Sequence, residues 1–170
     1  MLAVLSYGQG VSFGEGSDIS RIEAQITALD EDHCEIPCGI YGDSLRISLM
    51  KEHIKTIEKG MVQITELSSA AKPNYNQLVR WVMNKEHHAT EIQTIASQYF
   101  MHQRVKMPKA GLYGKEKTAA MEKYNGLLHN LHAIQVYAMK CKQSTDQGNV
   151  DKLQAALKKF DHWYFHGHSH

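Results

Sequence analysis

The sequence predicts an all-α protein, an antiparallel up-and-down four-helix bundle, and three observations lead to this prediction. Apolar residues recur at alternating steps of three and four along four long segments, which is the period of a helix buried on one face. Stretches that contain proline, glycine and small polar residues separate these segments. The strict apolar–polar alternation of a half-buried strand is absent from the sequence.

The four predicted helices follow one another with short connections. They are expected over about 44–69, 75–106 and 115–143, with a last helix that starts near residue 150. The inward-facing residues are expected to be Ile47, Met50, Ile54, Ile57, Met61 and Ile64; Leu78, Val82, Ala89, Ile92, Ala96 and Tyr99; Met121, Tyr124, Leu128, Leu131, Ile134 and Ala138; and Val150, Leu153, Leu157, Phe160 and Tyr164. The connections "SSAAKPNYN", "KMPKAGLYG" and "STDQGN" contain the helix-breaking residues.

The residues before these helices differ from the rest in charge. Residues 7–17 are rich in glycine, and a short amphipathic helix is predicted from Ile19 to Leu29. Residues 1–32 carry six acidic side chains against one arginine, a net charge of −5, whereas the remainder carries +6. Without the first segment the protein would be basic and could attract small anions, although the excess positive charge also serves solubility.

The composition is that of an ordinary globular protein. The chain has 170 residues, of which 42% are hydrophobic and 22% are charged, and this is enough for one domain with a substantial core. No apolar run approaches the roughly 20 residues that span a bilayer. The amino terminus lacks the basic start and long apolar run of a signal peptide. We therefore expect a cytoplasmic protein that acts on neither membranes nor nucleic acids.

The most unusual stretch is "DEDHCEIPCGIYG", residues 30–42, which gathers a histidine and two of the three cysteines. Two thiolates with an imidazole nitrogen suit a borderline-soft transition metal, and Cys34 and Cys38 are close enough to hold one ion. Two alternatives remain open, namely half of a structural zinc site and a small disulfide loop. Pro37 makes this loop rigid in each case.

Other histidines and the third cysteine are weaker candidates for a site. A di-iron carboxylate centre requires paired Glu-x-x-His motifs, but "KEHHATE" has the reverse order and is unpaired, so His87 and His88 are expected to be surface or packing residues. The carboxyl-terminal His166, His168 and His170 could bind a divalent metal weakly, although a disordered tail is the expectation. Cys141 is expected to be a buried thiol.

The pattern His-Cys-x-x-Pro-Cys-Gly-x-Tyr over residues 33–41, followed by a four-helix bundle, resembles the nickel-dependent superoxide dismutases. The resemblance extends to about residue 165, and "NQLVRWVMNKEHHA", "SQYFMHQR" and "AMKCKQ" resemble the marine and cyanobacterial branch of that family. It implies an oxidoreductase that converts superoxide to dioxygen and hydrogen peroxide, with one nickel ion per subunit that cycles between Ni(II) and Ni(III). It also implies a homohexamer.

The resemblance further implies a nickel hook at residues 33–41 and a removable pro-segment at residues 1–32. In such a hook the nickel ligands are the amine and imidazole of His33, the amide nitrogen and thiolate of Cys34, and the thiolate of Cys38. Tyr41 would stand at the mouth of the site and limit access to small anions. The free amine requires a maturation protease that cleaves before His33, which leaves residues 33–170 as the four-helix-bundle enzyme.

The sequence departs from the family pattern in places. Ser48 stands where a glutamate that orients the axial histidine is expected, and His88 lies near the position of the expected arginine. Glu35 replaces an aspartate, and Tyr99 resembles a second tyrosine near the site. A non-enzymatic bundle that binds nickel, zinc or copper through the same thiolates is the alternative function, and a structural bundle with a disulfide between the two hook cysteines is a third.

Overall fold

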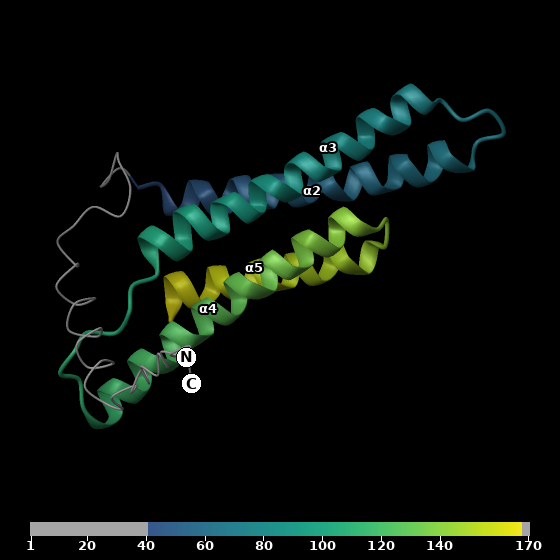
Figure 1. The fold of residues 1–170 in the computed structure, drawn as a ribbon. Coiled ribbons are helices and arrows are strands. Elements are labelled where there is room, and N and C mark those ends of the chain that lie inside the picture. Colours follow the sequence, from purple (N-terminus) through teal and green to yellow (C-terminus); the bar gives the residue numbers. More distant parts are fainter. Residues whose placement is uncertain (1–40, 168–170) are drawn as a thin grey trace, which may run out of the picture. The chain divides into compact units, whose positions relative to one another are not determined.

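The computed structural model describes residues 41–167, which belong to one compact unit. Four helices make up this part of the chain: α2 (Asp43–Ser69), α3 (Tyr75–Thr94), α4 (Gly114–Gln143) and α5 (Gln147–His166). A π-helical segment, η2 (Ile95–Arg104), continues α3 (Figure 1). No strand occurs between residues 41 and 167, so the prediction of an all-helical bundle is confirmed for this range. The predicted nickel hook except for Tyr41, the pro-segment and its short helix lie outside the described residues.

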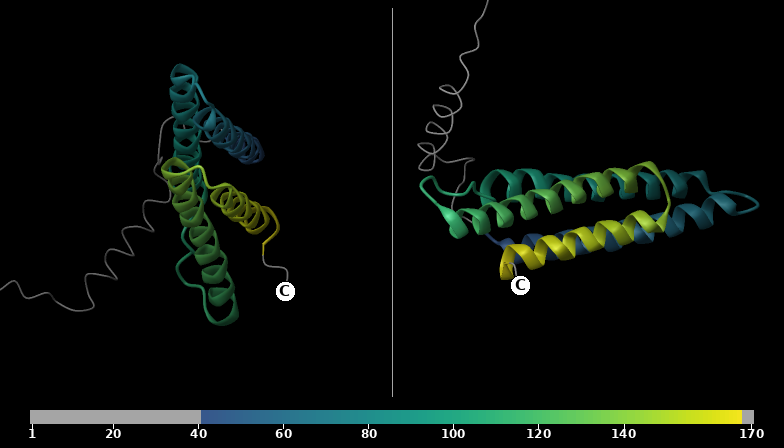
Figure 2. Two further views of the ribbon diagram at one scale, coloured as in Figure 1. Left: turned by 90° about the vertical axis from the view of Figure 1, so that its right-hand side faces the viewer. Right: turned by 90° about the horizontal axis from the view of Figure 1, so that it is seen from below.

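Each helix packs against the next one in the chain, and α5 packs back against α2. Figures 1 and 2 show that the α2–α3 and α4–α5 connections lie at one end of the bundle and the η2–α4 connection at the other. Consecutive helices are therefore antiparallel, as the short connections predict. The first turn of α2, the last turn of η2 and the last turn of α5 consequently lie at the same end. None of the helices in the described range is long and apolar enough to cross a membrane.

Capping side chains mark the starts of two helices, and a glycine allows the turn before a third. Asn74 caps α3 by accepting a hydrogen bond from the backbone N–H of Gln77 at 3.2 Å, and Asp146 caps α5 through the N–H of Gly148 at 2.9 Å. Gly111, in the connection between η2 and α4, has a φ of 85°, which a residue with a side chain rarely adopts. The breaks predicted at Pro73 and Pro108 are thus observed connections, whereas Gly148 of the third predicted break lies in the first turn of α5.

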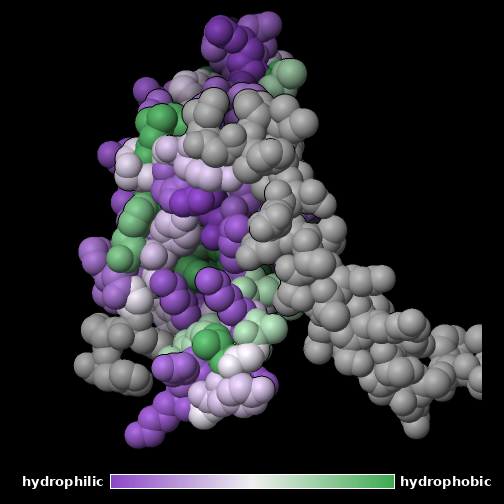
Figure 3. Space-filling view, turned by 90° about the vertical axis from the view of Figure 1, so that its left-hand side faces the viewer, coloured by the Kyte–Doolittle hydropathy of each residue, from purple (hydrophilic) through white to green (hydrophobic). Residues whose placement is uncertain are grey.

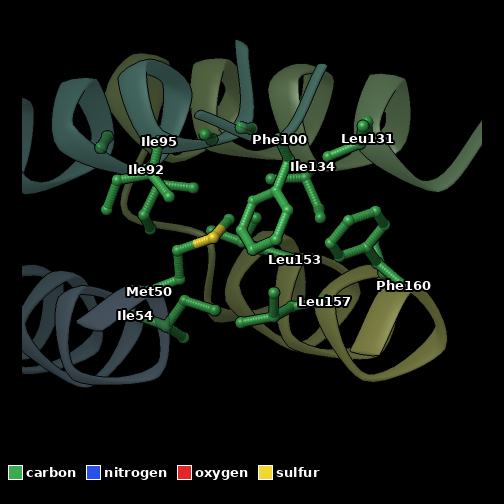
Figure 4. Close-up of a cluster of buried hydrophobic side chains, with 14 of the residues drawn as sticks. Met50, Ile54, Ile92, Ile95, Phe100, Leu131, Ile134, Leu153, Leu157 and Phe160 are labelled. Atoms are coloured by element: carbon green, nitrogen blue, oxygen red, sulfur yellow. The ribbon is translucent and has the colours of Figure 1, made fainter. Parts of the chain in front are cut away.

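Most of the predicted inward-facing residues are buried in the core (Figure 4). Val82 and Met121 are exceptions, since 37% and 38% of their surfaces are exposed. Val82 lies in the first half of α3, and Met121 lies in the first half of α4. At these two positions the prediction of a core side chain is wrong.

Two close contacts, one within the α4–α5 hairpin and one between α3 and α4, are not revealed by the apolar pattern. A Cβ added to Gly126 of α4 would lie 1.8 Å from Cζ3 of Trp163 of α5, so the indole packs directly on the helix backbone. The Lys85 side chain is buried and donates hydrogen bonds to the carbonyls of Cys141 (2.7 Å) and Lys142. It thereby satisfies carbonyls in the last turn of α4 that have no partner within the helix.

Candidate metal centre

The structure describes one of the predicted site residues, Tyr41, which directly precedes α2. His33, Cys34 and Cys38 lie outside the described residues. The Tyr41 side chain is partly exposed, and the guanidinium of Arg104 stacks over its ring with Cζ 4.1 Å from the ring centroid. The Tyr99 ring meets the Tyr41 ring edge-on, with 6.2 Å between centroids. Tyr41 is therefore held against the end of η2.

A partly buried polar cluster, the Asp43 cluster, lies directly beneath this tyrosine. It comprises Asp43 at the start of α2, Tyr99 and Arg104 of η2, and Tyr164 of α5. The Asp43 carboxylate accepts hydrogen bonds from the Tyr99 hydroxyl (2.5 Å), the Tyr164 hydroxyl (2.8 Å) and Arg104, whose Nε and Nη2 atoms lie 2.9 and 2.7 Å away. Only 16% of the Asp43 side chain is exposed. One carboxylate thus joins three helical elements at this end of the bundle.

The same cluster fixes the backbone that follows the predicted hook. The N–H of Gly42 donates a hydrogen bond to the Tyr99 hydroxyl oxygen at 2.8 Å, and that hydroxyl in turn donates to Asp43. The chain direction after Tyr41 is therefore set by two successive residues that are tied to η2. An acidic residue in the first turn of α2 is also favoured by the helix dipole.

The ionisation states of the Asp43 cluster follow from its hydrogen bonds. Burial alone would raise the pKa of Asp43, but hydrogen bonds from Arg104, Tyr99 and Tyr164 and the charge of Arg104 lower it below its ordinary value. Burial, with the hydrogen bond to Asp43, raises the pKa of Tyr99, and it raises the pKa of Tyr164 to about 12. The hydrogen bond to Asp43 raises the pKa of Arg104. At neutral pH the cluster is an ion pair with two protonated tyrosines.

The π-helical geometry of η2 explains how two of its side chains reach one carboxylate. A hydrogen bond runs from the N–H of Val105 to the carbonyl of Phe100, five residues earlier, at 2.8 Å. In such a helix, residues five apart lie nearly above one another, whereas an α-helix would place Tyr99 and Arg104 about 140° apart. The wide turn therefore aims both side chains at Asp43.

An open hollow of about 490 Å³ adjoins the Asp43 cluster. Three cationic side chains line it, Arg104, Lys106 and Lys123, together with the single carboxylate of Asp43. Figure 3 looks onto this end of the molecule and shows hydrophilic residues interspersed with smaller hydrophobic patches. Arg104 is paired with Asp43, and Lys123 is a further cation in this lining, a charge that favours small anions.

The residues that depart from the family pattern lie apart from the Asp43 cluster. Ser48 is exposed, and its hydroxyl donates to the carbonyl of Ser44 within the same helix. His88 is half-buried, and its Nδ1 lies 2.7 Å from Nδ1 of His53 across the α2–α3 interface. Burial lowers the pKa of both imidazoles, and at His88 the charge of His53 adds to this effect. His87 is exposed, so both histidines of "KEHHATE" are surface or packing residues, as predicted.

The remaining candidates from the sequence are the third cysteine and the histidines near the carboxyl terminus. Cys141 is fully buried, and burial raises the pKa of its thiol to about 11, so it stays protonated at neutral pH. His166 is exposed in the last turn of α5, and the other two histidines of the tail lie outside the described range. Within residues 41–167, no group of three or more His, Cys, Asp or Glu side chains is placed to hold a metal ion.

Sequence reasoning identified Tyr41 and Tyr99 but missed the other members of the Asp43 cluster. Tyr164 was predicted only as a core residue, and Asp43 and Arg104 were not singled out. A signal existed for Asp43, since a lone acidic residue at a helix start two positions after the hook tyrosine is placed to anchor it. No local pattern identifies Arg104 as its partner.

The comparison with known families gives a match that extends over most of the chain. The family described as nickel-containing superoxide dismutase matches residues 25–168, which include the predicted hook and all four helices. No curated protein and no solved structure matches the chain. The marine and cyanobacterial branch stays a prediction from the sequence. The chain belongs to the nickel-containing superoxide dismutases, oxidoreductases that use a nickel cofactor.

Proposed function

We propose that this superoxide dismutase holds its nickel in the hook at residues 33–41, through His33, Cys34 and Cys38. The donor set fits the metal, because two thiolates and nitrogen ligands suit a borderline-soft ion and stabilise its oxidised state. When bound, nickel supplies the one-electron Ni(II)/Ni(III) couple that converts superoxide to dioxygen and hydrogen peroxide. The observation that best supports this location is the Asp43 cluster, which secures the chain directly after the hook.

The Asp43 cluster has the properties of a rigid base for a catalytic loop. The Gly42 N–H and the Asp43 carboxylate are both tied to Tyr99, so the two residues after Tyr41 have fixed positions. Tyr99 and Tyr164 keep their protons at neutral pH, because the pKa of each hydroxyl is raised. They therefore hold the carboxylate as hydrogen-bond donors.

Positive charge beside the hook would favour an anionic substrate. Arg104, Lys106 and Lys123 line the hollow next to the Asp43 cluster, and residues 33–170 carry a net charge of +6. Superoxide carries one negative charge, and a cationic cleft raises the rate at which such an ion arrives. Tyr41, stacked on Arg104, would then limit access to small anions.

Maturation is part of the proposal. A peptide nitrogen at His33 is no neutral amine donor, whereas a free α-amino group with a reference pKa of about 7.7–8.0 is available near neutral pH. Cleavage of the bond before His33 by a maturation protease would supply that amine and remove residues 1–32 as a pro-segment. A homohexamer of residues 33–170 in the cytoplasm completes the proposal, on the basis of the family resemblance.

The test compares a chain that starts at His33 with the full chain, both loaded with nickel. The shortened chain should bind one nickel ion and dismute superoxide, and Cys34→Ser or Cys38→Ser should abolish both properties while the far-ultraviolet circular dichroism is kept. Cys141→Ala is the matched control, since it removes the remaining thiol from the core without touching the hook. Full activity in a chain that still begins at Met1 would rule out the amine ligand.

A further inference from the structure

Two histidines lie one turn apart on the surface of α5, close to its carboxyl-terminal end. His162 and His166 are both exposed, and their ring centroids are 5.6 Å apart with 35° between the ring planes. Their spacing of four residues places both imidazoles on the same side of the helix. Tyr164, between them in the sequence, points the opposite way and donates its hydrogen bond to Asp43. The histidine pair is therefore on the outer side of the turn that closes the Asp43 cluster.

This arrangement suits a divalent transition metal. Two histidines four apart on one helical face are the pair that holds zinc in helical metalloprotease sites. With metal–nitrogen bonds of about 2.0–2.1 Å, the ring centres of two imidazoles on one ion lie about 5 Å apart. The observed 5.6 Å is close to that value, so small side-chain rotations are sufficient. Imidazole nitrogen binds copper, nickel and zinc, and water would complete the coordination.

The helix end favours a cation, whereas the exposed Lys158, one turn before His162, opposes one, and the two imidazoles are the candidate protein ligands. The last turn of a helix carries partial negative charge from its unpaired carbonyls. Asp161, the carboxylate next to His162 in the sequence, is engaged by Lys51 of α2 at 2.8 Å. A site built here has two protein donors, which is consistent with the lack of any three-residue group in the described range.

We propose that His162 and His166 form a second metal site, separate from the hook, that binds Cu(II), Ni(II) or Zn(II). The site does not depend on cleavage before His33, because neither ligand requires a free amine. Preparations of this protein should consequently take up more nickel than the hook alone accounts for. The proposal does not rest on the function proposed for the hook.

The test uses the full chain with Cys34→Ser and Cys38→Ser, so that the hook thiolates cannot contribute. Ni(II) and Cu(II) binding is measured by equilibrium dialysis and calorimetry, before and after His162→Ala and His166→Ala are added. The added substitutions should weaken the binding of one equivalent at least tenfold. They should also remove the nitrogen hyperfine structure of two imidazoles from the Cu(II) electron paramagnetic resonance spectrum.

Two control variants identify the source of any binding. His102→Ala with His132→Ala removes two exposed imidazoles from different helices, and metal binding should stay unchanged. His168→Ala with His170→Ala should also retain the site. Binding that survives loss of the α5 pair, or that disappears only with the tail histidines, overturns the proposal. Because the hook is disabled throughout, either result leaves the test of dismutase activity unaffected.

Discussion

Replacing Asp43 by asparagine should destabilise the bundle by about 2–3 kcal/mol. The carboxamide keeps the size of the side chain but has one acceptor oxygen, so an amide donor replaces the other oxygen and one of the contacts to the Arg104 guanidinium is lost together with the negative charge. A hydrogen bond to a charged group contributes about 1.5–3 kcal/mol, and breaking a fully buried ion pair costs about 3–5 kcal/mol. Exposed fractions of 16% for Asp43 and 26% for Arg104 let water replace part of the loss, which places the expected value below that upper range.

The assay is urea unfolding followed by circular dichroism at pH 7, in a chain without bound metal. Glu58→Gln removes an exposed carboxylate from the same helix and should change the free energy of unfolding by less than about 0.5 kcal/mol. In a double-mutant cycle with Arg104→Met, the coupling energy should be at least about 1 kcal/mol. Additive effects, or an Asp43→Asn variant as stable as the Glu58 control, would refute the reasoning.

The pH dependence provides a second check on the same carboxylate. Because the folded-state pKa of Asp43 is lowered, its stabilisation is fully present above the unfolded pKa of about 3.9. It is lost as the pH falls through the lower folded pKa, since the unfolded state binds the proton more strongly. The difference in stability between the wild type and Asp43→Asn should therefore shrink toward the acid end of the titration. A difference that stays constant down to that end would contradict the assignment.

Three further predictions concern other contacts. Gly126→Ala should cost about 1–3 kcal/mol or more in thermal unfolding, because the new methyl group overlaps the Trp163 ring. Tyr99→Phe should cost about 1–2 kcal/mol in urea unfolding and lower the dismutation rate of the nickel-loaded enzyme, because Gly42 and Asp43 each lose a hydrogen bond. His53→Gln with His88→Gln should flatten the loss of stability that the wild type shows as the pH falls below about 6.5, where the unfolded chain binds more protons than the folded pair.

Each of these variants has a matched control. Gly60→Ala places its methyl group 3.4 Å from the Lys85 Cβ, an ordinary contact, and should be neutral or slightly stabilising. Tyr75→Phe removes an exposed hydroxyl from the start of α3 and should change neither stability nor activity. His129→Gln removes an exposed imidazole from α4 and should leave the pH profile as it is. A control that behaves like its partner variant would mean that the named contact is not the cause.

The helices and most of the core could be predicted because their signals are local. Steps of three and four residues between apolar positions define each buried face, and proline and glycine mark the connections. The exposure of Val82 and Met121 could not be predicted, because it depends on how the helices pack against one another. The burial of Lys85 could not be predicted either, because the carbonyls that its side chain contacts belong to the last turn of another helix, α4.

Part of the candidate site could likewise be predicted from the sequence, and part of it could not. The hook motif is recognisable because its ligands lie within a few residues of one another. The Asp43 cluster joins Asp43 to residues that are 56 to 121 positions away, and only the packing of α2, η2 and α5 brings them together. Sequence periodicity also assumes 3.6 residues per turn, so it could not place Arg104 on the same side as Tyr99.

Because η2 is a π-helix, the number of residues in this segment determines the directions in which its side chains point. Deleting or inserting one residue before Tyr99 would rotate its side chain by about 100° relative to Ala89 and Ile92, which keep α3 in the core. A homologous chain could retain both the tyrosine and the arginine and still lose their shared target through a change in spacing alone. Tolerance to insertions and deletions in Ile95–Arg104 should therefore be far lower than tolerance to substitutions at its exposed positions.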